Sequence, residues 1–351
     1  MTSAERILCA ANLGQADMVP VAPYLGNHGA RLAGVRLDEY CRSGEVMADA
    51  QIRTWEVYHQ DAVVAQSDNY YIAEGFGLQV EHHPDSTPTA STLPVGELAD
   101  IEKLRVPDPR TAGRMPVYLD AIARLARHFR GQVAVRAPGT GPFSLAGHLM
   151  GTERFLMELA MADQEPDGPE AKLLRRLMEL TTDSLIAFAK ACLEAGATIV
   201  QAGDSLASLD MISPAMYRKW AWPSERRFFG ELTPLAQRHG AATLMHICGN
   251  MTGVLEPMAD TGAMILELDS KVDLATAKRL VGSRVCLMGN LNPVTALWRG
   301  SPQEVRLAAK QAIAAAGAGG GFILGSGCEV PPAAPRENLL AMVDAARTWC
   351  E

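Results

Sequence analysis

The sequence has no long apolar run. None of its 351 residues belongs to a stretch of about 18 consecutive apolar residues, which a membrane-spanning helix requires. The N-terminus also lacks the basic segment followed by an apolar one that marks a secretion signal. Residues 2–8 predict a capped amphipathic helix instead. We therefore expect neither a membrane span nor a signal peptide.

Basic residues and cysteines are scarce as well. The chain has 32 Lys and Arg against 40 Asp and Glu, a net charge of -8, which argues against the basic surface that binds nucleic acid. Its seven cysteines are an odd number, thinly spread, and favour a reducing cytoplasm over a disulfide framework. What the chain does have is 48% hydrophobic residues, enough for a large core.

Eight short apolar segments recur along the chain, and most are separated by helical periodicity. They lie at residues 19–23, 61–65, 133–136, 198–202, 241–248, 263–269, 285–290 and 321–325. Helical patterns cover residues 37–58, 117–129, 150–195, 213–239 and 335–346. Alternating strands and helices favour a parallel sheet, and eight such units predict one α/β domain over residues 1–351, a (β/α)₈ TIM barrel.

Three further segments complete this predicted barrel. The capped helix at residues 2–8 precedes the first strand. Residues 24–29 are polar and rich in glycine, and they predict a loop after that strand. Residues 70–116 are rich in Pro, Thr and Asp, and predict an irregular excursion with short hairpin pieces after the second strand. Excursions of this length are usually functional or packed against the rim.

Polar residues follow the predicted strands, where barrel active sites gather. They are Asn27, His28, Asp68, Asn69, Arg136, Asp204, His246, Cys248, Glu267, Asp269, Asn290 and Cys328. Because the ends of strands are polar in most proteins, this pattern alone does not locate a site.

Residues 241–250 carry the strongest chemical signal. Strand side chains alternate between faces, so His246 and Cys248 point to the same side. An imidazole beside a thiolate suits zinc. Cys328 ends another apolar run that breaks into glycine, and is the best candidate for a third ligand. The alternative is a locally hydrogen-bonded histidine and a buried, inert cysteine, which is common.

Five other residues are weaker candidates. Glu267 is a candidate labile fourth ligand and catalytic carboxylate, a role that Asp269 on the same face could take; the alternative for Glu267 is an ion pair with a rim Lys or Arg. Asp204 is a candidate to orient a ligand, bind substrate or act as a base; the alternative is a solvated turn residue. Asn250 and Asn290 are candidate substrate contacts by position only.

The remaining cysteines predict no chemistry. They lie in apolar or helical patterns and are interpreted as filler: Cys9, Cys41, Cys192, Cys286 and Cys350. The pair at residues 82–83, both histidine, falls in the irregular excursion and is expected at the surface. The glycine run at residues 317–321 precedes a strand instead of following one, so it does not fit a dinucleotide-binding loop.

Three motifs resemble a known family. They are His-Ile-Cys-Gly-Asn at residues 246–250, Leu-Met-Gly-Asn-Leu-Asn-Pro at 287–293 and Gly-Ser-Gly-Cys-Glu-Val-Pro-Pro at 325–332. They are similar to the uroporphyrinogen decarboxylase superfamily, and more narrowly to its cobamide-dependent methyltransferase branch. That branch includes methylcobamide:coenzyme M methyltransferases and corrinoid O-demethylase components. The similarity runs through most of the chain.

The resemblance implies a zinc site and excludes the parent activity. In the methyltransferase branch the His-x-Cys and the distal Gly-Cys bind zinc, and these match His246, Cys248 and Cys328. The decarboxylases need no metal and carry Arg-Gln-Ala-Gly-Arg-Tyr near the N-terminus. This chain has Leu-Gly-Asn-His-Gly-Ala-Arg at residues 25–31 instead. We therefore expect the family fold without the decarboxylase activity.

The expected function is zinc-assisted methyl transfer between a corrinoid and a small thiol or methylated compound. No cobalamin-carrier segment is visible in the sequence, so the corrinoid is expected on a separate corrinoid protein. One alternative is a metal-free lyase acting on a tetrapyrrole. Another is a non-catalytic chaperone that binds a corrinoid or a metal.

Overall fold

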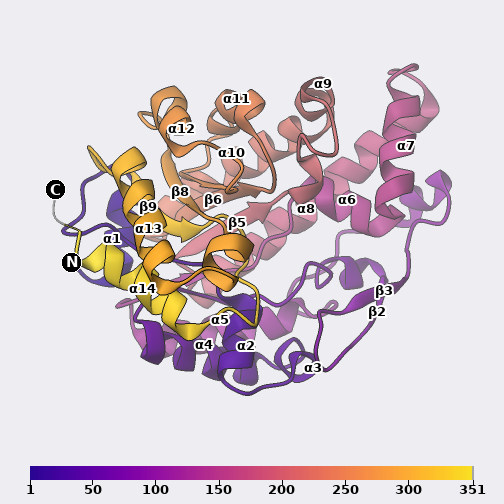
Figure 1. The fold of residues 1–351 in the computed structure, drawn as a ribbon. Coiled ribbons are helices and arrows are strands. Elements are labelled where there is room, and N and C mark those ends of the chain that lie inside the picture. Colours follow the sequence, from indigo (N-terminus) through magenta and orange to yellow (C-terminus); the bar gives the residue numbers. More distant parts are fainter. Residues whose placement is uncertain (350–351) are drawn as a thin grey trace.

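The fold is a curled parallel sheet with helices packed around it (Figure 1). The computed structural model describes residues 1–349. Seven strands pair side by side, all parallel, in the order β1 (Ala62–Val64), β4 (Ala134–Arg136), β5 (Ile199–Gly203), β6 (Ala242–Ile247), β7 (Ile265–Leu268), β8 (Cys286–Leu291) and β9 (Phe322–Ser326). An α/β fold with a parallel sheet is confirmed.

The first predicted strand, residues 19–23, is wrong as a regular strand. Val21 forms only an isolated bridge with Leu324 of β9. The segment nevertheless spans the space between the two edge strands, because Ala22 N–H donates to the carbonyl of Leu324 and Asp61 N–H to that of Val21, each at 2.8 Å. Two of its five residues are prolines, which have no N–H to donate to a ladder. Seven strands and one bridging segment therefore stand where eight strands were predicted.

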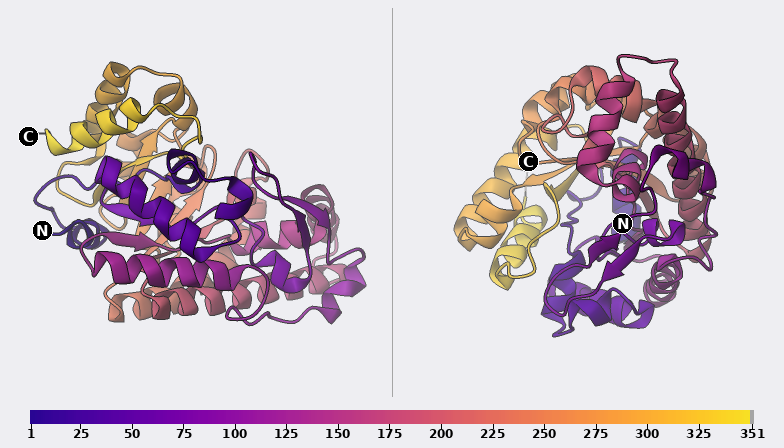
Figure 2. Two further views of the ribbon diagram at one scale, coloured as in Figure 1. Left: turned by 90° about the horizontal axis from the view of Figure 1, so that it is seen from below. Right: turned by 90° about the vertical axis from the view of Figure 1, so that its right-hand side faces the viewer.

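Helices cover the outside of the sheet (Figure 2). They are α4 (Gly44–Tyr58), α5 (Met115–Phe129), α8 (Pro169–Ala195), α10 (Trp222–Arg238), α12 (Leu274–Val281), α13 (Pro302–Ala316) and α14 (Arg336–Arg347). The other helices are α2 (Gly26–Leu32), α3 (Leu37–Tyr40), α6 (Pro142–Met150), α7 (Thr152–Ala162), α9 (Pro214–Met216) and α11 (Leu255–Ala259), and π-helical turns cover Tyr217–Ala221 and Pro293–Trp298. Within residues 1–349, no helix has both the length and the apolar composition needed to cross a bilayer.

Helix α1 (Ser3–Ala11) closes one end of the sheet. Thr2 and Glu5 form a capping box at its start, as residues 2–8 predicted. Its N-terminal backbone bonds to Gln132, just before β4, and the turn after it bonds to Gly321, just before β9. Ile7 packs there among buried side chains from inside the sheet. Helix α1 thus covers the end of the sheet where the strands begin. A site is therefore expected at the opposite end, where the strands finish.

Two predicted segments differ from the structure. The loop predicted at residues 24–29 is wrong, because α2 begins at Gly26. A Cβ at Gly26 would lie 2.9 Å from the Gln66 carbonyl oxygen, so glycine is needed there for close packing. The helix predicted at 37–58 is interrupted after α3 and restarts at α4, where the Ser43 hydroxyl caps the first turn. Helix α6 was not predicted, since almost all its residues are buried and show no periodicity.

The excursion at residues 70–116 contains the expected hairpin. Strands β2 (Gln79–Glu81) and β3 (Thr89–Thr92) pair antiparallel as a separate small sheet. Single-turn helices flank it at Ala73–Phe76 and Leu98–Lys103. Figure 1 places this hairpin on the side of the molecule that carries α7, far from both termini.

Candidate metal centre

Two cysteines and a histidine converge where the sheet strands end. His246 lies near the end of β6, Cys248 just after it, and Cys328 two residues after β9. Their ligand atoms all lie within 4.8 Å of one another. Nε2 of His246 is 3.2 Å from Sγ of Cys248, and that sulfur is 3.8 Å from Sγ of Cys328. The structure thus brings together the three residues that the sequence predicted as metal ligands.

The orientation of His246 suits a ligand. Its Nδ1 lies 3.0 Å from the carbonyl oxygen of Glu267. A carbonyl only accepts hydrogen bonds, so Nδ1 carries a hydrogen, and Nε2, which faces Cys248, is the nitrogen that can bind a metal after it releases its own proton. One imidazole nitrogen and two sulfurs form a donor set typical of zinc with an open position. The residues present therefore fit a zinc ion.

Hydrogen bonds among the two sulfurs and the imidazole shift the pKa values of all three groups. The Cys328 thiol donates to Cys248 and His246 does likewise, and together they lower the pKa of Cys248 to about 4 against the effect of burial. The pKa of Cys328 is raised by the same bond and by burial. Burial alone would lower the pKa of His246, but Cys248 and Glu267 raise it to about 9. A thiolate at Cys248 is the form of cysteine that binds a metal.

Glu267 is held by an arginine. Both of its carboxylate oxygens accept from the guanidinium of Arg136, at 2.7 Å each, and Nε of Arg136 donates to Oε1 of Gln201 at 2.6 Å. Glu267 is fully buried and lies on the Nδ1 side of His246, away from Nε2. This position corresponds to the ion-pair alternative. It favours an orienting role over the predicted roles as a fourth ligand and as a catalytic residue, which stay predictions.

Asp204 is buried behind the site. Its two carboxylate oxygens accept from the backbone N–H groups of Phe143 (3.1 Å) and Ser144 (2.6 Å), in the first turn of α6. Burial raises the pKa of Asp204 to about 6. Its own N–H donates to the carbonyl of His246 at 2.8 Å. Asp204 therefore joins the start of α6 to the end of β6, and its predicted catalytic role stays a prediction.

The remaining candidates hold loops around the three candidate metal ligands. Oδ2 of Asp269 accepts from the N–H of Gly249, directly after Cys248, at 2.9 Å. The amide of Asn290 donates to the Asp269 carbonyl at 3.0 Å, and exposed Asn250 accepts from Thr252. Neither Asn250 nor Asn290 lines the cavity described next. Their predicted substrate contacts remain predictions.

A cavity of about 440 Å³ opens over the three ligand residues. Its polar lining comes from strand ends, the loops after them, the small hairpin and helix α6: Tyr24, Gln66, Ser67, Asp68, Asn69, Tyr70, Thr87, Thr89, Arg136, His148, Gln201, Ser205, His246, Cys248, Cys328 and Glu329. Ser205 Oγ lies 3.2 Å from Sγ of Cys248, and the Arg136 guanidinium stacks on Tyr24 at 4.4 Å. The cavity combines three candidate metal ligands with space for a small molecule.

Several lining residues were not predicted from the sequence. Glu329 follows Cys328 directly, Ser205 follows Asp204, and Tyr24 follows the first apolar segment, so their positions at strand ends were a usable signal. His148 belongs to helix α6 and had no such signal. Thr87 comes from the loop between β2 and β3, so it does not follow a strand of the main sheet in the sequence.

Comparison with known sequences and structures assigns the chain to a protein family. The sequence profile of the uroporphyrinogen decarboxylase (URO-D) family matches residues 2–349. The chain belongs to the uroporphyrinogen decarboxylase family. This family member is 32% identical over 262 residues to the methylcobamide:CoM methyltransferase MtbA of Methanosarcina mazei, covering 75% of this chain and 72% of that protein. It is 27% identical to the methylcobamide:CoM methyltransferase MtaA of Methanosarcina barkeri, covering 97% and 96%.

A solved structure agrees with these relatives. A methyltransferase from Methanosarcina mazei superposes with a TM-score of 0.88 at 26% identity, covering 99% of this chain and 98% of that one. The resemblance to the methyltransferase branch of the family, predicted from three motifs, is therefore confirmed.

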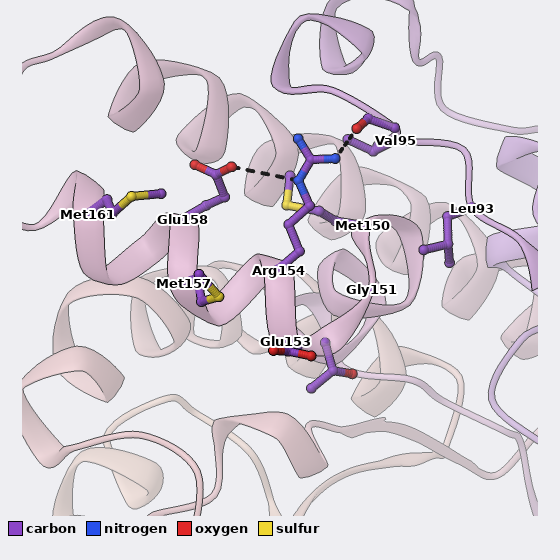
Figure 3. Close-up of a pocket in the computed structure, with 11 residues that line it drawn as sticks. Leu93, Val95, Met150, Gly151, Glu153, Arg154, Met157, Glu158 and Met161 are labelled. Carbon is purple, nitrogen blue, oxygen red and sulfur yellow. Dashed lines mark hydrogen bonds and ion pairs between the residues drawn. The ribbon is translucent and has the colours of Figure 1, made fainter.

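This family member has a second hollow, which lacks the chemistry of the first. It measures about 480 Å³ and lies between the chain after β3 and helix α7 (Figure 3). Leu93, Met157 and Met161 line it and are exposed. Arg154 contacts Glu158 and the carbonyl of Gly96 across it. Its lining includes no cysteine or histidine, so the candidate chemistry of the family member lies at the strand ends.

The other cysteines lie apart from the cluster. Cys192 and Cys286 are buried, Cys9 is half-buried, and Cys350 lies outside the described residues. Cys41 is buried and its sulfur lies 3.3 Å from Nδ1 of His82. His82 is half-buried, so it is less exposed than the sequence predicted.

Proposed function

We propose that this protein is a zinc-dependent methyltransferase that moves a methyl group between a corrinoid and a small thiol or methylated compound. The convergence of His246, Cys248 and Cys328 at the floor of an open cavity carries the proposal. The relatives named as methylcobamide:CoM methyltransferases support the corrinoid and the thiol. They match over most of this chain.

The three converging residues would hold the metal. Three protein ligands leave one position of a tetrahedral zinc for substrate, as in catalytic zinc sites. A zinc ion bound there supplies Lewis acidity, which favours the thiolate form of a thiol or polarises the heteroatom of a methylated donor. Ser205, within 3.2 Å of Sγ of Cys248, donates a hydrogen bond that tempers the charge on that sulfur.

Buried polar contacts support the ligands. The carbonyl of Glu267 holds the imidazole of His246 in one tautomer, and Arg136 holds the carboxylate of Glu267. The N–H of Gly249, which donates to Asp269, keeps the loop after Cys248 in place. The corrinoid, which supplies or accepts the methyl group, reaches the cavity mouth on a separate protein in this proposal.

The proposal is tested with methylcobalamin as donor and 2-mercaptoethanol as acceptor, followed by the change in the cobalt absorption spectrum. We expect turnover with the zinc-loaded protein and its loss in Cys248→Ala and Cys328→Ala, while Cys9→Ala on α1 stays active. No turnover with zinc-loaded, folded protein and either thiol acceptors or methylated donors would overturn it.

The same protein tests the two alternatives from the sequence. A tetrapyrrole lyase would convert a porphyrinogen after its metal has been removed with a chelator. A corrinoid- or metal-binding chaperone would bind its cargo and turn over neither substrate. We expect neither result, because the ligand set points to a metal with an open position.

A further inference from the structure

The cavity over the three ligand residues has an arginine in its wall, and the charge of that residue is already paired. Among its lining residues, all within the described part of the chain, Arg136 is the one Lys or Arg. All three of its nitrogens are engaged, two by Glu267 and one by Gln201. One face of its guanidinium is covered by the ring of Tyr24. Arg136 and Glu267 cancel in charge, so this arginine is not free for an anionic ligand.

Other cations near the cavity are also neutralised or absent from its wall. Arg114 lies behind Asp68, with which it forms two hydrogen bonds of 2.7 and 2.8 Å, and it also pairs with Glu74. Lys271, which follows β7, pairs with Asp210 at 2.6 Å and does not line the cavity. Burial lowers the pKa of His148 to about 4, so that imidazole is uncharged at neutral pH.

Two oxygen acceptors of lining residues have no cation beside them. Oε1 of Gln66 is buried and has no partner. The carboxyl group of Glu329 contacts the backbone N–H of Asn27 at 2.9 Å and no cation. In either ionisation state Glu329 adds no positive charge. A zinc ion bound by two thiolates and a neutral imidazole adds no net positive charge either, because the two thiolates offset the two charges of the metal.

We propose that the molecule exchanging its methyl group here carries no anionic group besides the reacting sulfur. It is an uncharged or cationic small thiol or methylated compound. An anionic group would lose its hydration in the cavity without gaining a positive partner. This inference rests on the proposed function and narrows its substrate class. It separates this chain from an enzyme for 2-mercaptoethanesulfonate, whose sulfonate is anionic.

The test compares three thiols of matched length on zinc-loaded protein by isothermal titration calorimetry. They are uncharged 2-mercaptoethanol, cationic cysteamine and anionic 2-mercaptoethanesulfonate. We expect the anionic thiol to bind at least about tenfold more weakly than 2-mercaptoethanol, or ~1.4 kcal/mol. Equal or tighter binding of the anionic thiol overturns the inference and leaves methyl transfer standing. No binding of any thiol overturns the thiol chemistry of the proposed function and this inference with it.

A substitution that adds a positive charge to the cavity wall gives a second test. Thr87 lines the cavity at an exposed position of the hairpin, where an arginine needs no burial. We expect Thr87→Arg to tighten binding of 2-mercaptoethanesulfonate selectively, by about tenfold. Thr92→Arg adds the same charge at an exposed position of β3 that does not line the cavity, and is the matched control. Equal effects of both substitutions, or none from either, would contradict the charge argument.

Discussion

The carbonyl oxygen of Glu267 lies 3.0 Å from Nδ1 of His246, and its carboxylate lies 3.5 Å from the same nitrogen. The two residues are direct partners in the pairing of β6 with β7. Because Arg136 of β4 holds that carboxylate, the ring of His246 is oriented through contacts that reach across the sheet. The direction of Nε2 toward the sulfurs is therefore built into the sheet itself.

Removal of one ligand should remove the metal. We expect about one zinc per chain in the wild-type protein and a large loss of zinc in Cys328→Ala, because two ligands hold zinc poorly. Metal binding to the folded state also raises stability, by about 2.7 kcal/mol at a hundredfold excess over Kd. Elemental analysis and melting curves with and without zinc measure both effects. The control Cys9→Ala should keep full zinc and the full shift in melting temperature; a zinc-dependent shift retained in Cys328→Ala would contradict the assignment.

Glu267→Gln should destabilise the fold strongly. It leaves the buried Arg136 guanidinium without its counter-charge, which costs about 3–5 kcal/mol. Zinc affinity should fall by about 10–100-fold without disappearing, since the backbone carbonyl still holds His246. Urea denaturation and zinc titration test the two effects. Glu56→Gln breaks an exposed ion pair with Arg53 and should cost at most about 1 kcal/mol. Complete loss of zinc from folded Glu267→Gln would support the fourth-ligand role instead.

Substitutions at Asp204 distinguish a structural role of this residue from a catalytic one. Asp204→Ala leaves two buried N–H groups of α6 without acceptors and should cost about 1–3 kcal/mol. Asp204→Asn keeps one acceptor, so we expect a smaller loss of stability and substantial methyl transfer. Urea melts and the cobalt spectral assay on the same preparations give the comparison. Turnover abolished in stable, zinc-loaded Asp204→Asn would support the catalytic role that the sequence predicted.

The Asp68–Arg114 pair should make stability depend on acid pH. Burial alone would raise the pKa of Asp68, but the two bonds from Arg114 outweigh it and lower that pKa. A carboxyl with a lowered folded pKa contributes stability above its unfolded pKa of about 3.9 and loses it as the pH falls through the folded value. Asp68→Asn should thus destabilise by about 3–5 kcal/mol at pH 7 and by less below pH ~4.

Urea melts at both pH values test this dependence. Asp183→Asn, which removes an exposed partner of Arg227, is the control and should show little effect at either pH. A pH-independent loss in Asp68→Asn would show that the destabilisation comes from packing and not from the charge.

The ligand cluster was predictable because it follows from local rules. Alternation along one strand puts His246 and Cys248 on one face, and parallel strands bring their carboxyl ends, including the one before Cys328, to the same edge. The two sulfurs lie 3.8 Å apart because both follow strands whose carboxyl ends lie at the same edge of the sheet. The sequential order of the seven strands followed in the same way from the alternation of strands and helices.

The other features of the site and the fold depended on contacts between distant residues or on burial, which no local sequence pattern encodes. The pairing of Glu267 with Arg136 joins residues 131 positions apart, and the sequence left it as one of two alternatives. Helix α6 is buried on nearly every side, so it has no amphipathic period to detect. Two prolines turned the first apolar segment from a strand into an irregular bridge between β1 and β9.

X-ray absorption at the zinc edge tests the central claim most directly. For the resting protein we predict two sulfur neighbours at about 2.3 Å and lighter nitrogen or oxygen neighbours at about 2.0–2.1 Å. Addition of 2-mercaptoethanol should raise the sulfur count by about one, because the open position takes the substrate thiol. A zinc site without sulfur neighbours, or full methyl transfer by protein that holds no zinc, would contradict the account.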